Sequence, residues 1–248
     1  IGPGPQFQPL LSALLGTRRT LVAVVYGDGS ALSSPLLLSG PDAVLSVFVP
    51  GQANGEAVAD LLLGDENPSG ALPVTVYHPE YVNAIPFLDM GWRRFPGRGH
   101  RFLMNRSLEL LRFGASGSYT RFGLKTGQLS PSSVLASEPN VTVRLDVQLS
   151  NEGAVAGSKV VIAMMRQRGV RMPQRANRWL AAFTKVHALR PGETRLVSLQ
   201  LGSEAWQSFD SQHQDFVVVP GEYEIWLLGE DGGPLNGASA GIRVLRVH

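Results

Sequence analysis

The chain has 248 residues, of which 44% are hydrophobic, a composition that suits one large folded domain or two ordinary ones. The formal net charge is only +2, and the basic residues are scattered among carboxylates, which argues against nucleic-acid binding. No apolar run approaches the roughly 18 residues that a membrane-spanning helix requires, and the absence of cysteine excludes disulfides and thiolate sites.

The first part of the chain predicts alternating helices and strands. Residues 7–15 suit a helix, and the apolar run 20–26 has the length of a strand that is buried on both faces. Residues 43–49 form a second such run. A strand, a crossing segment and a strand, followed by a helix and a strand, predict a largely parallel sheet with helices outside it.

The segment 50–75, PGQANGEAVADLLLGDENPSGALPVT, joins three structural signals. Pro50-Gly51 ends a strand, and residues 54–63 have the apolar spacing of a helix that presses one face on a sheet. Asn67-Pro68 biases the backbone away from helix, and Gly70 accepts a positive φ angle. The sequence therefore predicts a fixed turn that leads into a strand over residues 72–78.

This segment resembles the signature of the second, α/β-sandwich domain of glycoside hydrolase family 3, where it follows the rim of a sugar-binding cleft. Residues 78–102, HPEYVNAIPFLDMGWRRFPGRGHRF, resemble the YVN…DM…PGR segment of the β-xylosidase and α-arabinofuranosidase branch of that family. Residues 112–122, RFGASGSYTRF, are similar to the family's PFGYGLSYT-x-F, although Ala115-Ser116-Gly117 replaces its tyrosine, glycine and leucine.

The second part of the chain changes to short runs that alternate apolar and polar residues, the pattern of a β-sandwich. It is similar to the fibronectin type III-like domain that ends many family 3 enzymes. We expect strands over residues 141–149, 159–165, 194–201, 215–219, 222–228 and 241–247.

The predicted fold is thus α/β followed by all-β, with an α/β-sandwich-like domain over residues 1–124 and a fibronectin type III-like domain over residues 140–248. Between them, residues 125–139 are rich in serine and proline and read as a linker, which Val134-Leu135 should anchor to the domains. The opening IGPGPQF lacks the features of a signal peptide and is typical of a domain boundary.

The resemblance implies the C-terminal portion of a β-xylosidase-like hydrolase without its catalytic pair. A retaining glycosidase places two carboxyl groups roughly 5 to 5.5 Å apart. In the family, the nucleophilic aspartate lies in a preceding (β/α)₈ barrel, and the acid/base glutamate of the xylosidase branch also lies upstream. No residue here matches either motif, so we assign no catalytic residue and expect an inactive chain that needs a barrel polypeptide or an upstream region as partner.

The alternative is a non-catalytic carbohydrate-binding or scaffold module within a larger extracellular assembly. The altered segment 115–117 favours it, as does Asp28 in the turn VYGDGS, where the family usually carries a Ser-Gly-Gly-Pro turn. Ligands bind open α/β sheets at such strand ends, but Asp-Gly is also a strong turn former.

Aromatic side chains that follow the expected strand 72–78 suit the apolar face of a sugar ring. The expected substrate-binding residues are Asp28, Tyr81, Asn83, Trp92, Arg98, His100 and Arg101. The five histidines lie far apart with no metal-ligand spacing, so we expect neither a metal nor another cofactor.

Two sequons, at Asn140 and Asn105, suit glycosylation in a protein that is secreted to the extracellular space or the cell wall. Three tryptophans of the second domain are expected in its core or at the domain interface: Trp179, Trp206 and Trp226.

Overall fold

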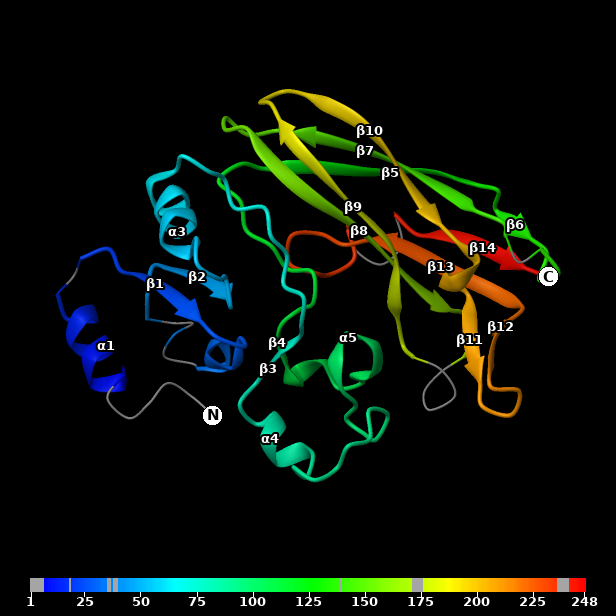
Figure 1. Ribbon diagram of the computed structural model, residues 1–248, viewed down its shortest axis with the longest axis horizontal. Coiled ribbons are helices and arrows are strands. Elements are labelled where there is room, and N and C mark those ends of the chain that lie inside the picture. Colours follow the sequence, from blue (N-terminus) through cyan, green and yellow to red (C-terminus); the bar gives the residue numbers. More distant parts are fainter. Residues whose placement is uncertain are drawn as a thin grey trace.

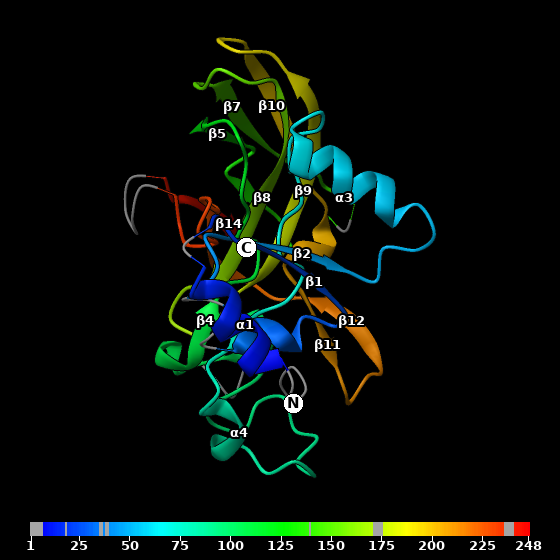
Figure 2. The same ribbon diagram turned by 90° about the vertical axis from the view of Figure 1, so that its left-hand side faces the viewer.

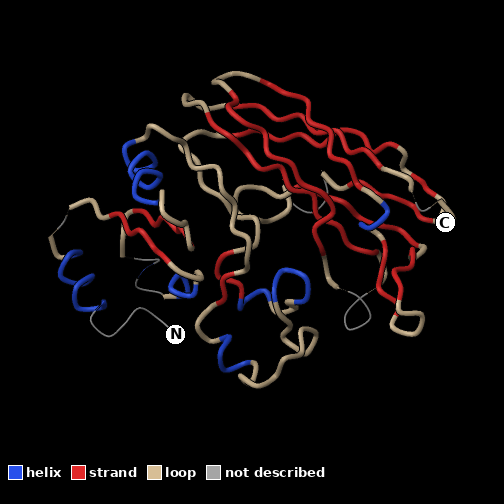
Figure 3. Tube along the Cα trace, in the orientation of Figure 1, coloured by secondary structure: helices blue, strands red, loops and turns tan. Residues whose placement is uncertain are grey.

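The computed structural model describes residues 7–17, 19–34, 37, 40–138, 140–170, 176–235 and 241–248. The opening residues 1–6, expected as a domain boundary, and Pro139, at the end of the expected linker, lie outside them. A mixed α/β part lies beside a β-sandwich, with most helices in the former and the long strands in the latter (Figures 1 and 3).

The α/β part begins as the sequence predicts. Helix α1 (Phe7–Leu15) precedes strand β1 (Val22–Tyr26), the short 3₁₀ helix η1 (Ser30–Ser33), strand β2 (Ala43–Phe48) and helix α3 (Asn54–Leu63). Strands β1 and β2 pair in parallel, Val22 with Ala43. A small core formed by Val25, Leu32, Leu37 and Val76 holds them together.

The expected largely parallel sheet is wrong for the described residues beyond β1 and β2. Strand β3 (Val76–Tyr77) pairs antiparallel with β4 (Glu109–Leu111) and joins no parallel strand. The expected strand 72–78 is interrupted. Leu72 exchanges backbone hydrogen bonds with Gly114 and Ala115, Pro73 has no N–H to donate, and regular pairing is limited to Val76–Tyr77. The run 20–26 is also less buried than expected, since Val22 is 42% and Tyr26 52% exposed.

Two sheets of the second part pack face to face (Figure 1). The first has the order β10-β7-β5 and is antiparallel, with strands β5 (Phe122–Ser130), β7 (Val143–Asn151) and β10 (Thr194–Leu201). The second has the order β6-β14-β13-β8-β9, with strands β6 (Ser133–Val134), β8 (Gly157–Gln167), β9 (Trp179–Leu189), β13 (Gly221–Leu227) and β14 (Arg243–Val247). A hairpin of β11 (Gln207–Asp210) and β12 (Asp215–Val218) completes this part.

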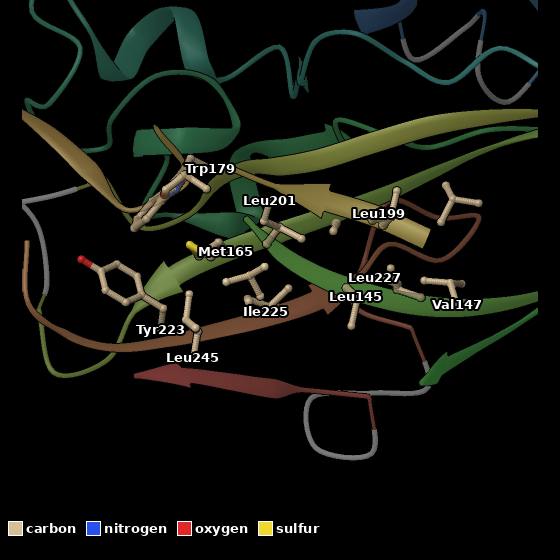
Figure 4. Close-up of a cluster of buried hydrophobic side chains, with 14 of the residues drawn as sticks. Leu145, Val147, Met165, Trp179, Leu199, Leu201, Tyr223, Ile225, Leu227 and Leu245 are labelled. Atoms are coloured by element: carbon tan, nitrogen blue, oxygen red, sulfur yellow. Dashed lines mark hydrogen bonds between the residues drawn. The ribbon is translucent and has the colours of Figure 1, made fainter. Parts of the chain in front are cut away.

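Alternation along the strands builds the sandwich core. On β7, Val143, Leu145, Val147 and Leu149 are each fully buried, while the residues between them are more exposed. Their side chains meet those of β8 and β13 between the two sheets (Figure 4). This is the arrangement expected when strands with one apolar face pack in two layers.

Most of the expected linker belongs to the sandwich. Strand β5 pairs with β7 as far as Ser130, and β6 pairs in parallel with β14, so residues 125–134 contribute to both sheets. Val134 is 4% exposed and lies in the core, as its expected anchoring role requires, whereas Leu135 is 51% exposed.

The five-stranded sheet is buried on both faces where the α/β part covers it. Ile162, Met164, Trp226 and Leu228 form a second cluster, against which Ala71 and Phe113 of the α/β part pack. All three tryptophans are buried, Trp179 and Trp206 in the sandwich core and Trp226 at this interface, which confirms the expectation for them. The two parts are thus joined through apolar side chains.

Candidate functional site

The segment 78–105 between β3 and β4, here called the aromatic loop, carries most of the expected binding residues. It includes two short helices, α4 (Tyr81–Ala84) and α5 (Gly99–Phe102). Both ribbon views place α4 at the end of the molecule away from β7 and β10 (Figures 1 and 2). The loop therefore projects from the covered face of the sandwich.

Two tyrosines fix the base of the aromatic loop. The rings of Tyr77 and Tyr81 stack with centroids 3.9 Å apart, and the Tyr81 hydroxyl donates to the Gly97 carbonyl at 2.8 Å. The Tyr77 hydroxyl accepts from the Gly99 N–H at 2.5 Å. Burial, with a smaller contribution from Tyr77, raises the pKa of Tyr81, so this phenol stays protonated and serves as a donor. Tyr81 therefore positions the loop.

A carboxylate and two arginines hold the middle of the loop. Asp89 accepts from the Gly91 N–H at 2.8 Å and from Arg94 Nη1 at 2.8 Å, and Arg98 Nη2 donates to the Asp89 carbonyl. The Gly91 N–H and then Arg94 keep the pKa of Asp89 low. Because its guanidinium is directed at backbone carbonyls of the loop, Arg98 shapes the loop from within.

Gly97 is the tightest point of the loop. Its φ angle is +84°, and a β-carbon there would lie 1.9 Å from the Phe102 carbonyl oxygen. Only glycine fits such a position without moving the backbone. The PGR motif thus encodes a close approach of two backbone segments.

The held loop exposes a group of apolar side chains, here called the apolar rim. Trp92 is 61% exposed, and its ring edge lies 3.8 Å from the β-carbon position of Gly99. Asn83, on α4, is exposed beside this rim. The rim consists of Val82 (75% exposed), Phe87 (93%), Leu88 (86%), Met90 (82%), Trp92 and Phe95 (66%). Several large exposed apolar side chains thus lie on one loop.

The backbone of His100 and Arg101 bonds to the sandwich, although the Arg101 side chain is exposed. The His100 ring stacks on Phe113 with centroids 4.0 Å apart, and its carbonyl accepts from Arg178 Nε at 3.0 Å. The Arg101 carbonyl accepts from the Asn177 N–H at 2.8 Å. Burial, followed by the charges of Arg178 and Arg101, lowers the pKa of His100 to about 4. His100 is therefore a neutral packing residue at the domain interface.

An ion pair that the sequence did not reveal closes this interface. Arg178 Nη2 lies 3.1 Å from Glu109 Oε1, and these side chains are only 7% and 2% exposed. Asn177 and Arg178 belong to no recognisable sequence motif. The residues around them in the sequence do not predict their contacts with a segment that lies about seventy residues earlier.

Asp28 lies in the turn after β1, two residues before η1. The helix η1 contacts β3. The Asp28 carboxylate is exposed and accepts from the Ser30 N–H at 2.9 Å, which lowers its pKa. The structure thus gives Asp28 a role in its own turn. Tyr81, Asn83, Trp92 and Arg98 lie on one loop, and the backbone carbonyls of His100 and Arg101 bond to the sandwich.

The most specific motifs of the sequence turn out to brace the fold. Asn67 of the GDENPSG turn accepts from the Ser118 hydroxyl and from the Tyr119 N–H, each at 2.9 Å. Its Nδ2 donates to the Ala156 carbonyl of the sandwich at 3.1 Å. In the altered segment, Ser116 accepts from the buried Lys159 of β8 at 2.9 Å.

Within the part of the chain that the structure describes, no helix is long and apolar enough to cross a membrane. The same residues contain no group of three histidine, aspartate or glutamate side chains that is arranged to hold a metal ion.

Family models match both parts of the sequence. Residues 4–116 match the glycosyl hydrolase family 3 C-terminal domain, and residues 160–230 match a fibronectin type III-like domain.

Curated relatives match nearly the whole chain. The probable exo-1,4-beta-xylosidase bxlB of Aspergillus terreus is 31% identical over 99% of this chain and 33% of its own length. The thermostable beta-glucosidase B of Acetivibrio thermocellus is 30% identical over 89% of this chain and 29% of its own length. The chain thus spans about a third of the length of these relatives.

Solved structures share the fold. The GH3 exo-beta-xylosidase XlnD superposes with a TM-score of 0.81 at 22% identity, over 99% of this chain and 33% of that one. The β-glucosidase EmGH1 of Erythrobacter marinus does so with a TM-score of 0.78 at 29% identity, over 100% of this chain and 30% of that one.

Proposed function

We propose that this chain forms one wall of a sugar-binding cleft. The chain belongs to glycoside hydrolase family 3 and consists of the family's C-terminal domain followed by a fibronectin type III-like domain. The chain is homologous to the C-terminal third of β-xylosidases and β-glucosidases. In our proposal it contributes substrate contacts and performs no hydrolysis by itself.

The apolar rim is the observation that carries this proposal. Trp92 and Phe95 are more than half exposed on a loop that hydrogen bonds hold in one conformation. A rigid exposed aromatic ring offers a stacking surface for the C–H face of a pyranose without a large loss of side-chain entropy. Asn83 lies next to the rim and supplies an amide for sugar hydroxyls.

The remaining apolar residues of the rim suit contact with protein. Phe87 and Leu88 are 93% and 86% exposed, which is costly for a surface that stays in water. We propose that they pack against a (β/α)₈-barrel polypeptide or an upstream region of the kind that the longer relatives carry in their other two thirds. That partner would supply the carboxylate pair.

Three carboxylates of the α/β part are engaged in structural contacts. Asp89 is bound to Gly91 and Arg94, Glu109 to Arg178, and Asp28 to its own turn. Retaining hydrolysis requires two carboxyl groups on either side of the scissile bond, and these three do not form such a pair.

We propose β-xylosides as the substrate class of the complete enzyme, with the xylosidase relative at 31% identity as support.

Titration of the purified chain with xylobiose tests the binding role. We expect weak binding in the millimolar range, because half a cleft lacks its opposing wall. The Trp92→Ala variant should abolish it, whereas Phe209→Ala, at an exposed aromatic residue of the β11–β12 hairpin, should not. Binding that survives Trp92→Ala unchanged would contradict the proposal.

A non-catalytic binding or scaffold module is the second candidate. The sequence departs from the family pattern at Asp28 and in the segment 115–117, and both departures support this candidate. Asp28 and Ser116 are engaged in structural hydrogen bonds. In either role we propose a secreted protein of the extracellular space or the cell wall, with the exposed sequon at Asn140 as support.

A further inference from the structure

A cavity of about 610 Å³, here called the arginine cavity, lies between the α/β part and the sandwich. Leu103, Met104 and Arg106 line it from the α/β part, and residues of β8, β13 and the start of β9 line it from the sandwich. Its size falls in the range of small-molecule sites. None of the residues that form the apolar rim lines it.

Two of its arginines share one carboxylate across the sheet. Arg166 of β8 stands opposite Glu224 of β13, and its Nε lies 2.5 Å from Glu224 Oε2. Arg168 follows the end of β8, and its Nε lies 2.9 Å from Glu224 Oε1. The Glu224 side chain is 9% exposed, while both arginines are about half exposed. One buried carboxylate thus presents two guanidinium groups to the cavity.

The opposite wall repeats this arrangement. Arg178 and Arg106 share Glu109, with N–O distances of 3.1 and 3.2 Å. Burial first, and then the charge of Arg106, lowers the pKa of Arg178 to about 10. Glu109 lies between these two cations and offsets part of their repulsion.

Arginines outnumber carboxylates among the described lining residues, while Glu109 and Glu222, outside the lining, pair with three of these arginines. Arg106, Arg166, Arg168 and Arg178 line the cavity, and Glu224 is the single carboxylate residue among the described lining residues. Glu222 also pairs with Arg168, at 3.0 Å, but it is shared with Arg246.

Trp226 brings a polar group without an acceptor among the described residues to the wall of the cavity. It lines the cavity and is 7% exposed, and its buried Nε1–H has no acceptor among the described residues. Buried polar groups in native proteins almost always have a hydrogen-bond partner. Its ring also packs under Arg166, whose guanidinium lies 5.8 Å from the ring centroid.

We propose that the arginine cavity binds a sugar-sized carboxylate, a uronic acid or a short saccharide that carries one. Guanidinium groups bind planar carboxylates through paired hydrogen bonds, and four of them surround this space. Leu103, Met104 and Ile242 offer apolar surface for the ring of such a ligand. The volume is larger than a bare inorganic ion needs. The arginine cavity is separate from the apolar rim. A failure to detect ligand binding in the cavity would therefore not contradict the proposed sugar-binding cleft.

Calorimetric titration of the 248-residue chain with D-glucuronate and with D-glucose tests the proposal, because the two ligands differ only in the carboxylate at C6. We expect saturable binding of glucuronate and none of glucose at the same concentrations. Raising the salt concentration should weaken the binding. Inorganic phosphate is the third ligand, and it should bind at least tenfold more weakly than glucuronate.

Substitutions locate the binding. Arg106→Gln removes a half-exposed guanidinium and should weaken glucuronate binding by roughly 10-fold to 100-fold, the loss of a charge-assisted hydrogen bond. Arg106→Lys keeps the charge and should weaken it less. Arg144→Gln is the matched control, since Arg144 is a half-exposed arginine that pairs with Asp146 on β7, away from the cavity. Arg168→Gln gives a second test if Arg106→Gln does not fold.

Nuclear magnetic resonance gives a second readout. The indole Nε1–H signal of Trp226, assigned by its loss in Trp226→Phe, should shift on addition of glucuronate and stay unchanged with glucose. Equal binding of glucose and glucuronate, phosphate binding as tight as glucuronate, or equal loss of affinity in Arg144→Gln and Arg106→Gln would each overturn the proposal.

Discussion

Asn67 and Ser118, 51 positions apart in the sequence, are joined by a 2.9 Å hydrogen bond from the Ser118 hydroxyl to Asn67 Oδ1. The same amide donates to Ala156 in the sandwich. The Asn67 side chain therefore joins three parts of the chain: the turn after α3, the segment that leads into β5, and the second domain. The family's most specific sequence signature fixes the relative position of two domains.

Replacing this amide should loosen the domain interface. We expect Asn67→Ala to lower the free energy of unfolding by about 2–3 kcal/mol, because it leaves several partners without a hydrogen bond. Asn83→Ala, at an exposed asparagine, should change it by less than about 0.5 kcal/mol. Urea denaturation of both variants measures the difference, and equal stabilities would refute the role of Asn67.

The close approach at Gly97 predicts a strong effect of one added carbon. Gly97→Ala forces a clash with the Phe102 carbonyl and a strained φ angle. We therefore expect the free energy of unfolding to fall by at least about 2 kcal/mol. The near-UV circular dichroism of the aromatic loop should also change. Gly55→Ala, inside α3 with no atom within 4 Å of the new carbon, should instead stabilise by about 0.5–1 kcal/mol. Thermal unfolding scans distinguish the two.

His100 makes the stability of the fold depend on pH. Its pKa is about 4 in the folded protein, below the roughly 6.5 of an exposed histidine, so the unfolded chain binds the proton first. The stabilisation is therefore complete above pH 6.5 and is lost as the pH falls toward 4. We expect His100→Phe, which keeps the stack on Phe113, to reduce this slope.

The control for this experiment is His187→Phe, at an exposed position of β9, which leaves the His100 contribution in place. Chemical denaturation at pH 7.0, 6.0 and 5.0 gives the slopes. A His100→Phe slope equal to that of the unmodified chain would show that the buried imidazole does not cause the effect.

Glycosylation should discriminate between the two sequons. Asn140 is exposed in the turn before β7, whereas the Asn105 side chain accepts from the Ser107 N–H at 3.1 Å and from its hydroxyl at 2.8 Å. In material secreted by a eukaryotic host we therefore expect a glycan on Asn140 and little on Asn105. Peptide mass spectrometry before and after deglycosylation decides this, with Asn140→Gln as the control. Unmodified Asn140 would contradict the prediction.

The sequence predicted local structure well where one physical signal dominates. Helix 54–63 has a clear apolar face and a glycine at its end, and the strand over residues 194–201 has the alternation of one buried face; both match the structure at their ends. The serine and proline content of residues 125–139 predicts a linker, although its first part pairs with β7 as far as Ser130 and Ser133 and Val134 pair with β14. Tertiary pairing overrode local composition there.

The candidate site could be predicted only in part. Residue type identified Trp92 and Tyr81, but not that Tyr81 turns inward to bind Gly97 while Trp92 faces solvent. His100 was expected at the sugar site, yet Arg178 holds its backbone at the domain interface. Arg178 lies 69 positions from Glu109 and 78 from His100, and contacts over such separations leave no periodic trace in the sequence. The sequence therefore did not predict the Arg178–Glu109 ion pair.

The central claim is that this chain is a cleft wall that depends on a separate catalytic pair. The most direct test measures hydrolysis of an aryl β-xyloside by the chain alone and by a fusion to the N-terminal two thirds of the Aspergillus terreus relative. We expect no turnover by the chain alone, since stacking residues cannot supply the more than about 8 kcal/mol by which enzymes lower barriers. The fusion should hydrolyse the substrate and lose activity with Trp92→Ala. Steady hydrolysis by the chain alone, abolished by Asp28→Asn, would contradict the account and make Asp28 a catalytic group.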